Sequence, residues 1–181
     1  MDNVREEEEK TLGIHAEDPA YHEIRIYNTV RDSIWQELVL LEYENDIDKV
    51  EKRLINLYLL LLRADEIWNE INESVKVQST RLRLVVDVLP YEGEFRKYAE
   101  KINTLIEIKR NAKMLCTSAG SPEVQQMATT YLQLPFYSKV EWLKKEAEKI
   151  VDEVGRIWGS KAAKIQYTMP IQIKESADPF F

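Results

Sequence analysis

The chain is poor in the residues that interrupt or cross-link a fold. It has five glycines and six prolines among 181 residues, so we expect long helices joined by few turns. Its one cysteine, Cys116, cannot form an internal disulfide, which fits a reducing compartment. The longest purely hydrophobic run is 57–62, and none follows Met1. No membrane span or secretory signal is therefore predicted, and we expect a soluble, cytoplasmic protein.

The residue patterns of common catalytic sites are also missing. There is no phosphate-binding or dinucleotide-binding glycine pattern. The two histidines, His15 and His22, follow Leu12 and Pro19 by three residues, so neither belongs to the Glu-x-x-His pair of four-helix di-metal proteins. Cys116 falls on an apolar helical stripe and is expected to be a buried thiol rather than a nucleophile. We predict a protein that is not an enzyme, with no metal and no cofactor.

Hydrophobic residues make up 44% of the chain and charged residues 31%, a balance typical of a globular domain. Apolar spacing of three and four residues predicts helices over 19–44, 47–75, 94–116, 122–134 and 138–159. The segment 79–89 fits either a strand or a helix, and its helical neighbours favour a helix. Asp46, Ser121 and a capping box at Ser138 are the predicted helix starts.

The segment 47–75 carries the strongest pattern in the chain. Its apolar residues keep heptad spacing: Ile47, Val50, Leu54, Leu57, Leu61, Ala64, Trp68, Ile71 and Val75. Around 57–62 the apolar surface covers nearly the whole circumference, so several helices must pack against it. The predicted fold is therefore all-α, a multi-helix bundle of long antiparallel heptad-patterned helices, rather than a two-stranded coiled coil.

Both ends of the chain differ from this helical region. We predict an acidic arm over 1–17, a helical bundle domain over 18–160 and an extended tail over 161–181. Apolar residues alternate in the tail, which ends in two aromatics. Such an arm suits a groove on another chain. The candidate assembly contacts are Ile165, Tyr167, Met169, Ile171, Ile173, Phe180 and Phe181.

Charge is spread unevenly along the chain. Net charge is −7, but 1–78 holds 19 acidic and 9 basic residues, whereas 79–181 holds 13 acidic and 16 basic residues. The most basic helix is 94–116, where Lys109 takes a position usually filled by an apolar residue. Its side chain either contacts phosphates or extends along the helix to reach water. The candidate phosphate contacts are Lys97, Lys101, Lys109, Arg110 and Lys113.

Two functions are consistent with these features. The first is a non-enzymatic assembly subunit that joins protein partners or copies of itself through helix faces and tails. The second is a helical subunit associated with nucleic acid inside a larger complex, although a net charge of −7 opposes tight binding by the isolated protein. Trp35 and Trp142 lie off the main apolar stripes, so each marks either a further interface or a wider buried face.

Overall fold

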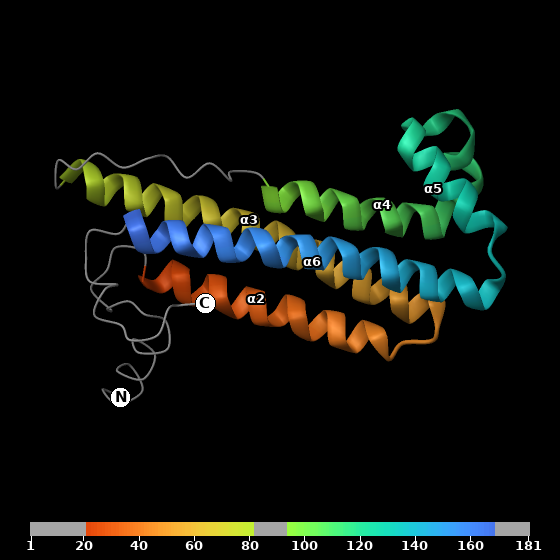
Figure 1. Ribbon diagram of the computed structural model, residues 1–181, viewed down its shortest axis with the longest axis horizontal. Helices are drawn as coiled ribbons and strands as arrows, with labels where there is room; N and C mark the ends of the chain where they lie inside the picture. Colours follow the sequence, from red (N-terminus) through yellow and green to blue (C-terminus); the bar gives the residue numbers. More distant parts are fainter. Residues whose placement is uncertain (1–20, 82–93, 169–181) are drawn as a thin grey trace. The chain divides into compact units, whose positions relative to one another are not determined.

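The computed structural model describes residues 21–81 and 94–168, and the regular structure there is helical (Figure 1). The α-helices are α2 (Tyr21–Glu42), α3 (Ile47–Arg81), α4 (Glu94–Met114), α5 (Pro122–Gln133) and α6 (Phe136–Thr168), and a π-helical turn, η1 (Leu115–Ala119), follows α4. The predicted all-α, multi-helix fold is confirmed. The predicted arm at 1–17 and most of the ambiguous segment 79–89 lie outside the described residues, although 79–81 are helical.

Side-chain caps define two of the helix starts, as the sequence predicted. The Asp46 carboxylate accepts hydrogen bonds from the backbone N–H groups of Asp48 at 2.8 Å and Lys49 at 3.4 Å. The Ser121 hydroxyl accepts one from Val124 N at 3.3 Å. Each cap satisfies backbone donors that have no partner within their own helix, which fixes where α3 and α5 begin.

The predicted bounds of the last helix, 138–159, are wrong at both ends. α6 begins at Phe136, directly after Pro135, and it continues to Thr168. Ile165 and Tyr167 are therefore helical, and the extended tail predicted from 161 is wrong as far as 168. The reason is that 161–164 (Lys-Ala-Ala-Lys) are strong helix formers that outweigh a single glycine before them. The tail contacts predicted from Met169 onward lie outside the described residues.

The chain divides into two compact units. Unit 1 comprises 1–31, 63–94 and 155–181, and unit 2 comprises 32–62 and 95–154. In the described part of unit 1, the rings of Tyr27 and Trp68 pack 5.7 Å apart, and both side chains are fully buried. Polar side chains share this interior: Asn28, Asp65 and Asn72 are all buried.

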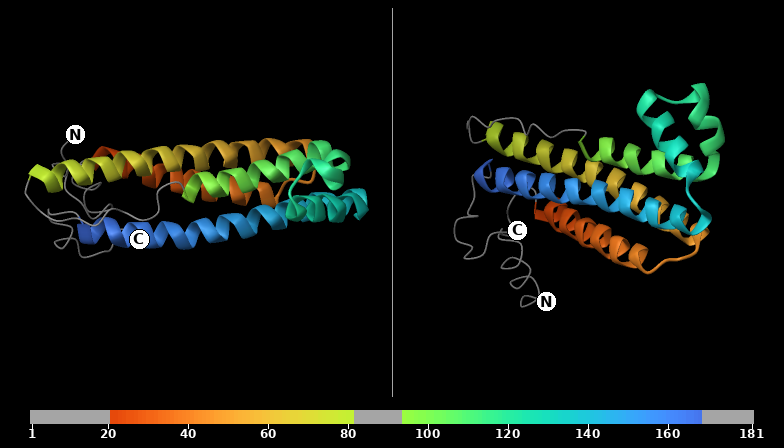
Figure 2. Two further views of the ribbon diagram at one scale, coloured as in Figure 1. Left: turned by 90° about the horizontal axis from the view of Figure 1, so that it is seen from above. Right: turned by 45° about the vertical axis from the view of Figure 1, so that its right-hand side comes forward.

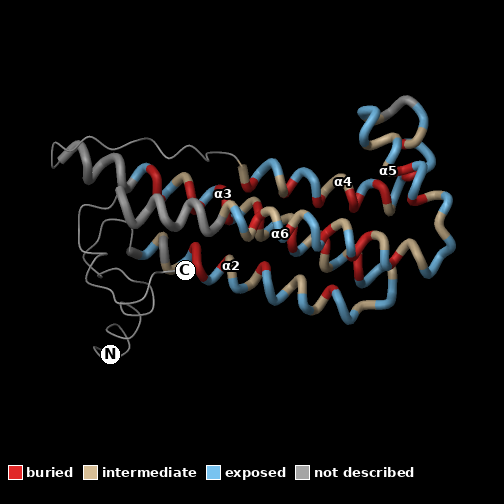
Figure 3. Tube along the Cα trace, viewed as in Figure 1, coloured by how far each residue is buried: buried red, intermediate tan, exposed pale blue. Residues whose placement is uncertain are grey.

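Unit 2 closes as a ring of four helical segments around an apolar core. Three ion pairs and one hydrogen bond join neighbouring helices. The ion pairs are Arg53–Glu37 between α3 and α2, Lys109–Asp48 between α4 and α3, and Lys101–Glu153 between α4 and α6. Between α6 and α2, the Lys144 ammonium donates to the Glu42 carbonyl. Both views in Figure 2 show α4 beside α3. Buried residues recur at intervals along each of these helices (Figure 3). Over the described ranges, no helix has the length and hydropathy needed to cross a membrane.

Candidate functional site

The outer face of α2 in unit 2 carries a line of exposed apolar side chains. Trp35 and Val39 are four residues apart and so lie on one side of the helix, and Tyr43 follows in the turn directly after Glu42. They are 38%, 52% and 77% exposed, whereas Ile34 and Leu41 on the opposite side are buried. α2 therefore has two apolar faces, and the core of unit 2 uses only one of them.

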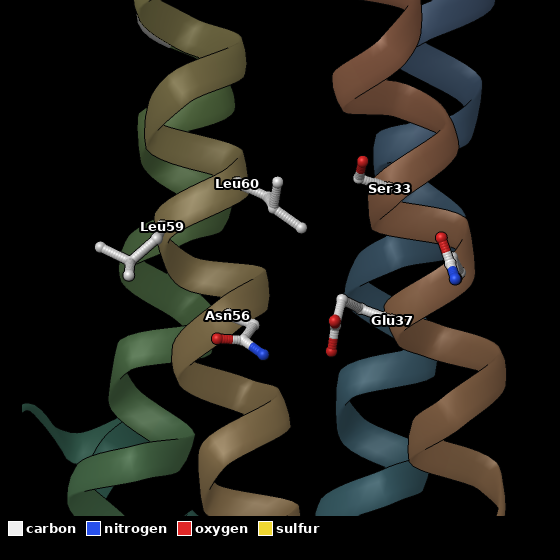
Figure 4. Close-up of a pocket in the computed structure, with 6 residues that line it drawn as sticks. Ser33, Glu37, Asn56, Leu59 and Leu60 are labelled. Carbon is white, nitrogen blue, oxygen red and sulfur yellow. The ribbon is translucent and has the colours of Figure 1, made fainter.

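A groove between α2 and α3 lies next to this exposed line. Its volume is about 440 Å³, and it is lined by Ser33, Gln36 and Glu37 of α2 and by Asn56, Leu59 and Leu60 of α3. In Figure 4, Asn56 and Leu60 point toward α2, and Leu59 points away from it. Leu59 is 55% exposed. The side chains that line the groove are polar on α2 and both polar and apolar on α3.

Arg53 fixes the spacing of the two helices beside the groove. Its guanidinium forms ion pairs with Glu37 at 3.2 Å and with Glu44 at 3.5 Å, and the three side chains are only 17–28% exposed. The planar guanidinium holds α3 to α2 and to the loop that joins them. The groove and the exposed apolar residues therefore lie on a helical hairpin that is held together by these ion pairs. We use the name hairpin face for this groove together with the four exposed residues Trp35, Val39, Tyr43 and Leu59.

The basic helix predicted as a phosphate contact is α4, and two of its five candidate residues are held by acids of α3. Lys109 forms ion pairs with Asp48 at 2.9 Å and with Glu51 at 3.4 Å, and Arg110 also pairs with Glu51. The side chains of Lys109 and Glu51 are only about one-sixth exposed. The Asp48 hydrogen bond raises the pKa of Lys109, assisted by the Glu51 charge and opposed by partial burial. Lys109 therefore joins two helices.

The other three candidates form no ion pair with the acids of α3 that hold Lys109 and Arg110. Lys97 and Lys113 are exposed. Lys101 is 45% exposed, lies 3.7 Å from a Glu153 oxygen and sits 5.1 Å from the centre of the Tyr98 ring. An exposed ion pair at this distance contributes little to stability. Arg96 and Arg110 of α4 are exposed as well, so the accessible positive charge of this helix includes these arginines and the three lysines.

A second cavity in unit 2 lies where α4, α5 and α6 meet. Its volume is about 260 Å³, with an apolar floor of Val124, Met127 and Ile150. Its charged rim is largely satisfied by its own members, because Lys101 pairs with Glu153 and Lys149 pairs with Glu146 at 3.0 Å. The volume lies below the range of about 300–1,000 Å³ that is usual for small-molecule sites.

The end of α4 departs from regular helix. Asn111 has non-helical dihedral angles (φ −136°, ψ 35°), and the chain then passes through the π-helical turn η1. Cys116 lies in that turn, half-buried, and its thiol donates to the Lys113 carbonyl at 3.2 Å. The turn reverses the chain so that α5 packs beside α6, where the rings of Tyr131 and Trp142 are 5.6 Å apart. Trp142 therefore belongs to this packing, and the sequence did not predict the π-helical turn.

The described residues offer no alternative based on metal chemistry. Within 21–81 and 94–168, no three His, Cys, Asp or Glu side chains are grouped closely enough to hold a metal ion. His15 lies outside these residues. No family model, curated protein or solved structure matches the chain.

Proposed function

We propose that the protein is a non-enzymatic assembly subunit that joins a larger complex through the hairpin face. The observation that carries this proposal is the second apolar face of α2. Large exposed apolar side chains are ordinary when scattered, but a contiguous row beside a groove is typical of a protein interface. Aromatic side chains such as Trp35 and Tyr43 are enriched at such interfaces, because they bury a large area with few rotatable bonds.

The charge layout of unit 2 supports the same proposal. Arg53, Lys109 and Lys144 are each bound to groups of the protein itself, so the charges nearest the core serve packing. The hairpin face lacks converging ionisable groups of the kind that acid–base chemistry requires. Its groove presents one carboxylate, Glu37, which Arg53 already neutralises. A partner helix would meet apolar side chains flanked by amide and hydroxyl groups.

Site-specific photo-cross-linking tests this function. A photoreactive amino acid replaces Val39 in cells that naturally make the protein, and the matched control replaces Glu148, an exposed residue of α6. We expect a discrete covalent adduct from position 39 and none from position 148. If position 39 gives no adduct, or both positions give the same diffuse products, the hairpin face is not an assembly surface.

The second candidate function is contact with nucleic acid through α4, supported by the exposed lysines Lys97 and Lys113 together with Lys101. With these three lysines as the contacts, each phosphate neutralised contributes a slope of about −0.9 to the dependence of log affinity on log salt. A filter-binding titration of the protein in its complex should then give a slope no steeper than about −3. An affinity that does not change with salt concentration would exclude α4 as the contact. An unchanged affinity in the double variant Lys97→Glu/Lys113→Glu would exclude it as well.

A further inference from the structure

The partner of the hairpin face can be argued from the order of residues along it. In Figure 4, Glu37 of α2 lies across the groove from Asn56 of α3, and Ser33 lies across from Leu60. α3 therefore runs antiparallel to α2, and each residue of one helix can be matched with the residue of the other that lies at the same height along the groove. We use the height of the Glu37–Asn56 pair, called the Glu37–Asn56 level, as the reference. Other residues are then described by how far along their helix they lie from it, toward the α2–α3 loop or away from that loop.

Apolar residues lie at nearly equal distances on the two sides of this level. Val39 is two residues beyond Glu37 toward the loop, a rise of about 3 Å. Leu59 is three residues beyond Asn56 away from the loop, a rise of about 4.5 Å. Val39 is on α2 and Leu59 is on α3, and both are more than half exposed. A two-fold axis through the groove would place Val39 of one copy against Leu59 of the other, twice.

An acidic residue of α2 and a basic residue of α3 also lie at similar distances on opposite sides of this level. Asp32 is five residues before Glu37, about 7.5 Å away from the loop, and Lys52 is four residues before Asn56, about 6 Å toward it. Both are exposed. The same two-fold axis would bring Asp32 of one copy to Lys52 of the other. A surface that is complementary to itself after a half-turn is the requirement for a symmetric dimer.

We infer that the occupant of the hairpin face is a second copy of this chain, docked face to face about a two-fold axis at the Glu37–Asn56 level. The inference rests on the proposed function and names its partner. Each copy would place the outer side of α2 on the outer side of the other copy's α3. Val39 and Leu59 would form the centre, and two Asp32–Lys52 pairs would lie at the rim.

Analytical ultracentrifugation of the purified full chain tests the dimer, with circular dichroism as the check on folding. Val39→Asp and Leu59→Asp place carboxylates in the apolar centre and should give monomers with unchanged helicity. Phe136→Asp is the matched control, because Phe136 is a 69% exposed apolar residue of unit 2 that lies on α6, away from the hairpin face. It should leave the dimer intact. Equal weakening by all three substitutions would overturn the inference.

A charge exchange tests the two-fold geometry itself. Asp32→Lys alone and Lys52→Asp alone each create like-charge pairs and should weaken the dimer about twofold to fivefold. The double variant restores opposite charges across the axis and should return the dissociation constant to within about twofold of the original. Double-variant weakening equal to the sum of the two single effects would overturn the geometry.

The assembly function of the hairpin face and the identity of its partner as a second copy can be refuted separately. A chain that stays monomeric to roughly 1 mM has no specific self-interface, and the second copy is then excluded. If photo-cross-linking from position 39 nevertheless gives a discrete adduct with a different protein, the assembly function stands without the dimer. If cross-linking from position 39 gives an adduct of twice the chain mass, both are supported.

Discussion

The cluster that joins α3 to α4 gives the sharpest stability prediction. Glu51 accepts from both Lys109 and Arg110, and its side chain is only 16% exposed. Glu51→Gln removes the charge on which two cations converge, while Lys109 keeps one partner in Asp48, which is 77% exposed and therefore solvent-screened. A hydrogen bond to a charged group contributes about 1.5–3 kcal/mol. We expect Glu51→Gln to cost about 2 kcal/mol, near the middle of that range.

Substitution of the basic partner, Lys109→Met, should lower the free energy of unfolding by less. Lys109→Met removes the amine but leaves Glu51 paired with Arg110, and the methionine packs where the lysine stem lay. Removing one partner of a buried ion pair is costly when the remaining charge is left uncompensated. After Lys109→Met, Arg110 still pairs with Glu51 and Asp48 is exposed to water, whereas after Glu51→Gln the Lys109 amine keeps only the exposed Asp48. The predicted asymmetry is therefore a larger loss from Glu51→Gln than from Lys109→Met.

Thermal unfolding followed by circular dichroism measures both losses. A cost of about 2 kcal/mol corresponds to a fall in Tm of about 4–8 °C for a chain of this size. Glu148→Gln removes a carboxylate of the same type from an exposed site on α6 and should leave Tm unchanged. If Lys109→Met costs as much as Glu51→Gln, or if Glu51→Gln matches the Glu148 control, the reasoning about this cluster is refuted.

Three further predictions concern the interior. Asn72 is buried and its Nδ2 has no hydrogen-bond partner, so Asn72→Leu should raise stability in urea unfolding by about 1 kcal/mol, and a decrease would contradict this. Burial raises the pKa of Tyr27 and of Tyr131, against smaller opposing effects of Arg31 and Lys109. A group whose pKa is higher in the folded than in the unfolded chain stabilises the fold fully below its unfolded pKa and less as the pH rises above that value. The stability should therefore fall above a pH of about 10, with tyrosinate absorbance rising as the chain unfolds. Tyrosinate appearing while the helices persist would contradict the prediction. Lys144→Met should lower Tm by several degrees, because the Glu42 carbonyl loses its charged donor, and an unchanged Tm would exclude that contribution.

Local sequence signals predicted the helices well because helix starts and apolar spacing are short-range properties. The heptad pattern placed α3 from Ile47 onward, and the cap at Asp46 that starts it appears as expected. The end of α6 was predicted too early because a glycine in the sequence was given more weight than the alanines that follow it. The π-helical turn after α4 has no comparable signal, since its residues also suit an ordinary helix.

The candidate site was harder to predict because it depends on which helices become neighbours. The sequence marks Lys109 as unusual, but its partners lie 58 and 61 residues earlier, and only the packing of α4 on α3 selects them. α2 carries two apolar faces, one through Ile34 and Leu41 and one through Trp35 and Val39. Spacing alone identifies both as helical faces, and only the packed structure shows that the second stays exposed.

The contact between Lys144 and the end of α2 sets the order in which unit 2 can be completed. A lysine that is 9% exposed donates to the carbonyl of Glu42, 102 residues earlier, and so places positive charge at the negative end of the α2 dipole. During synthesis, α2, α3 and α4 leave the ribosome before the segment that carries this lysine. The apolar surface of these three helices that α6 covers therefore stays exposed until α6 has been synthesised.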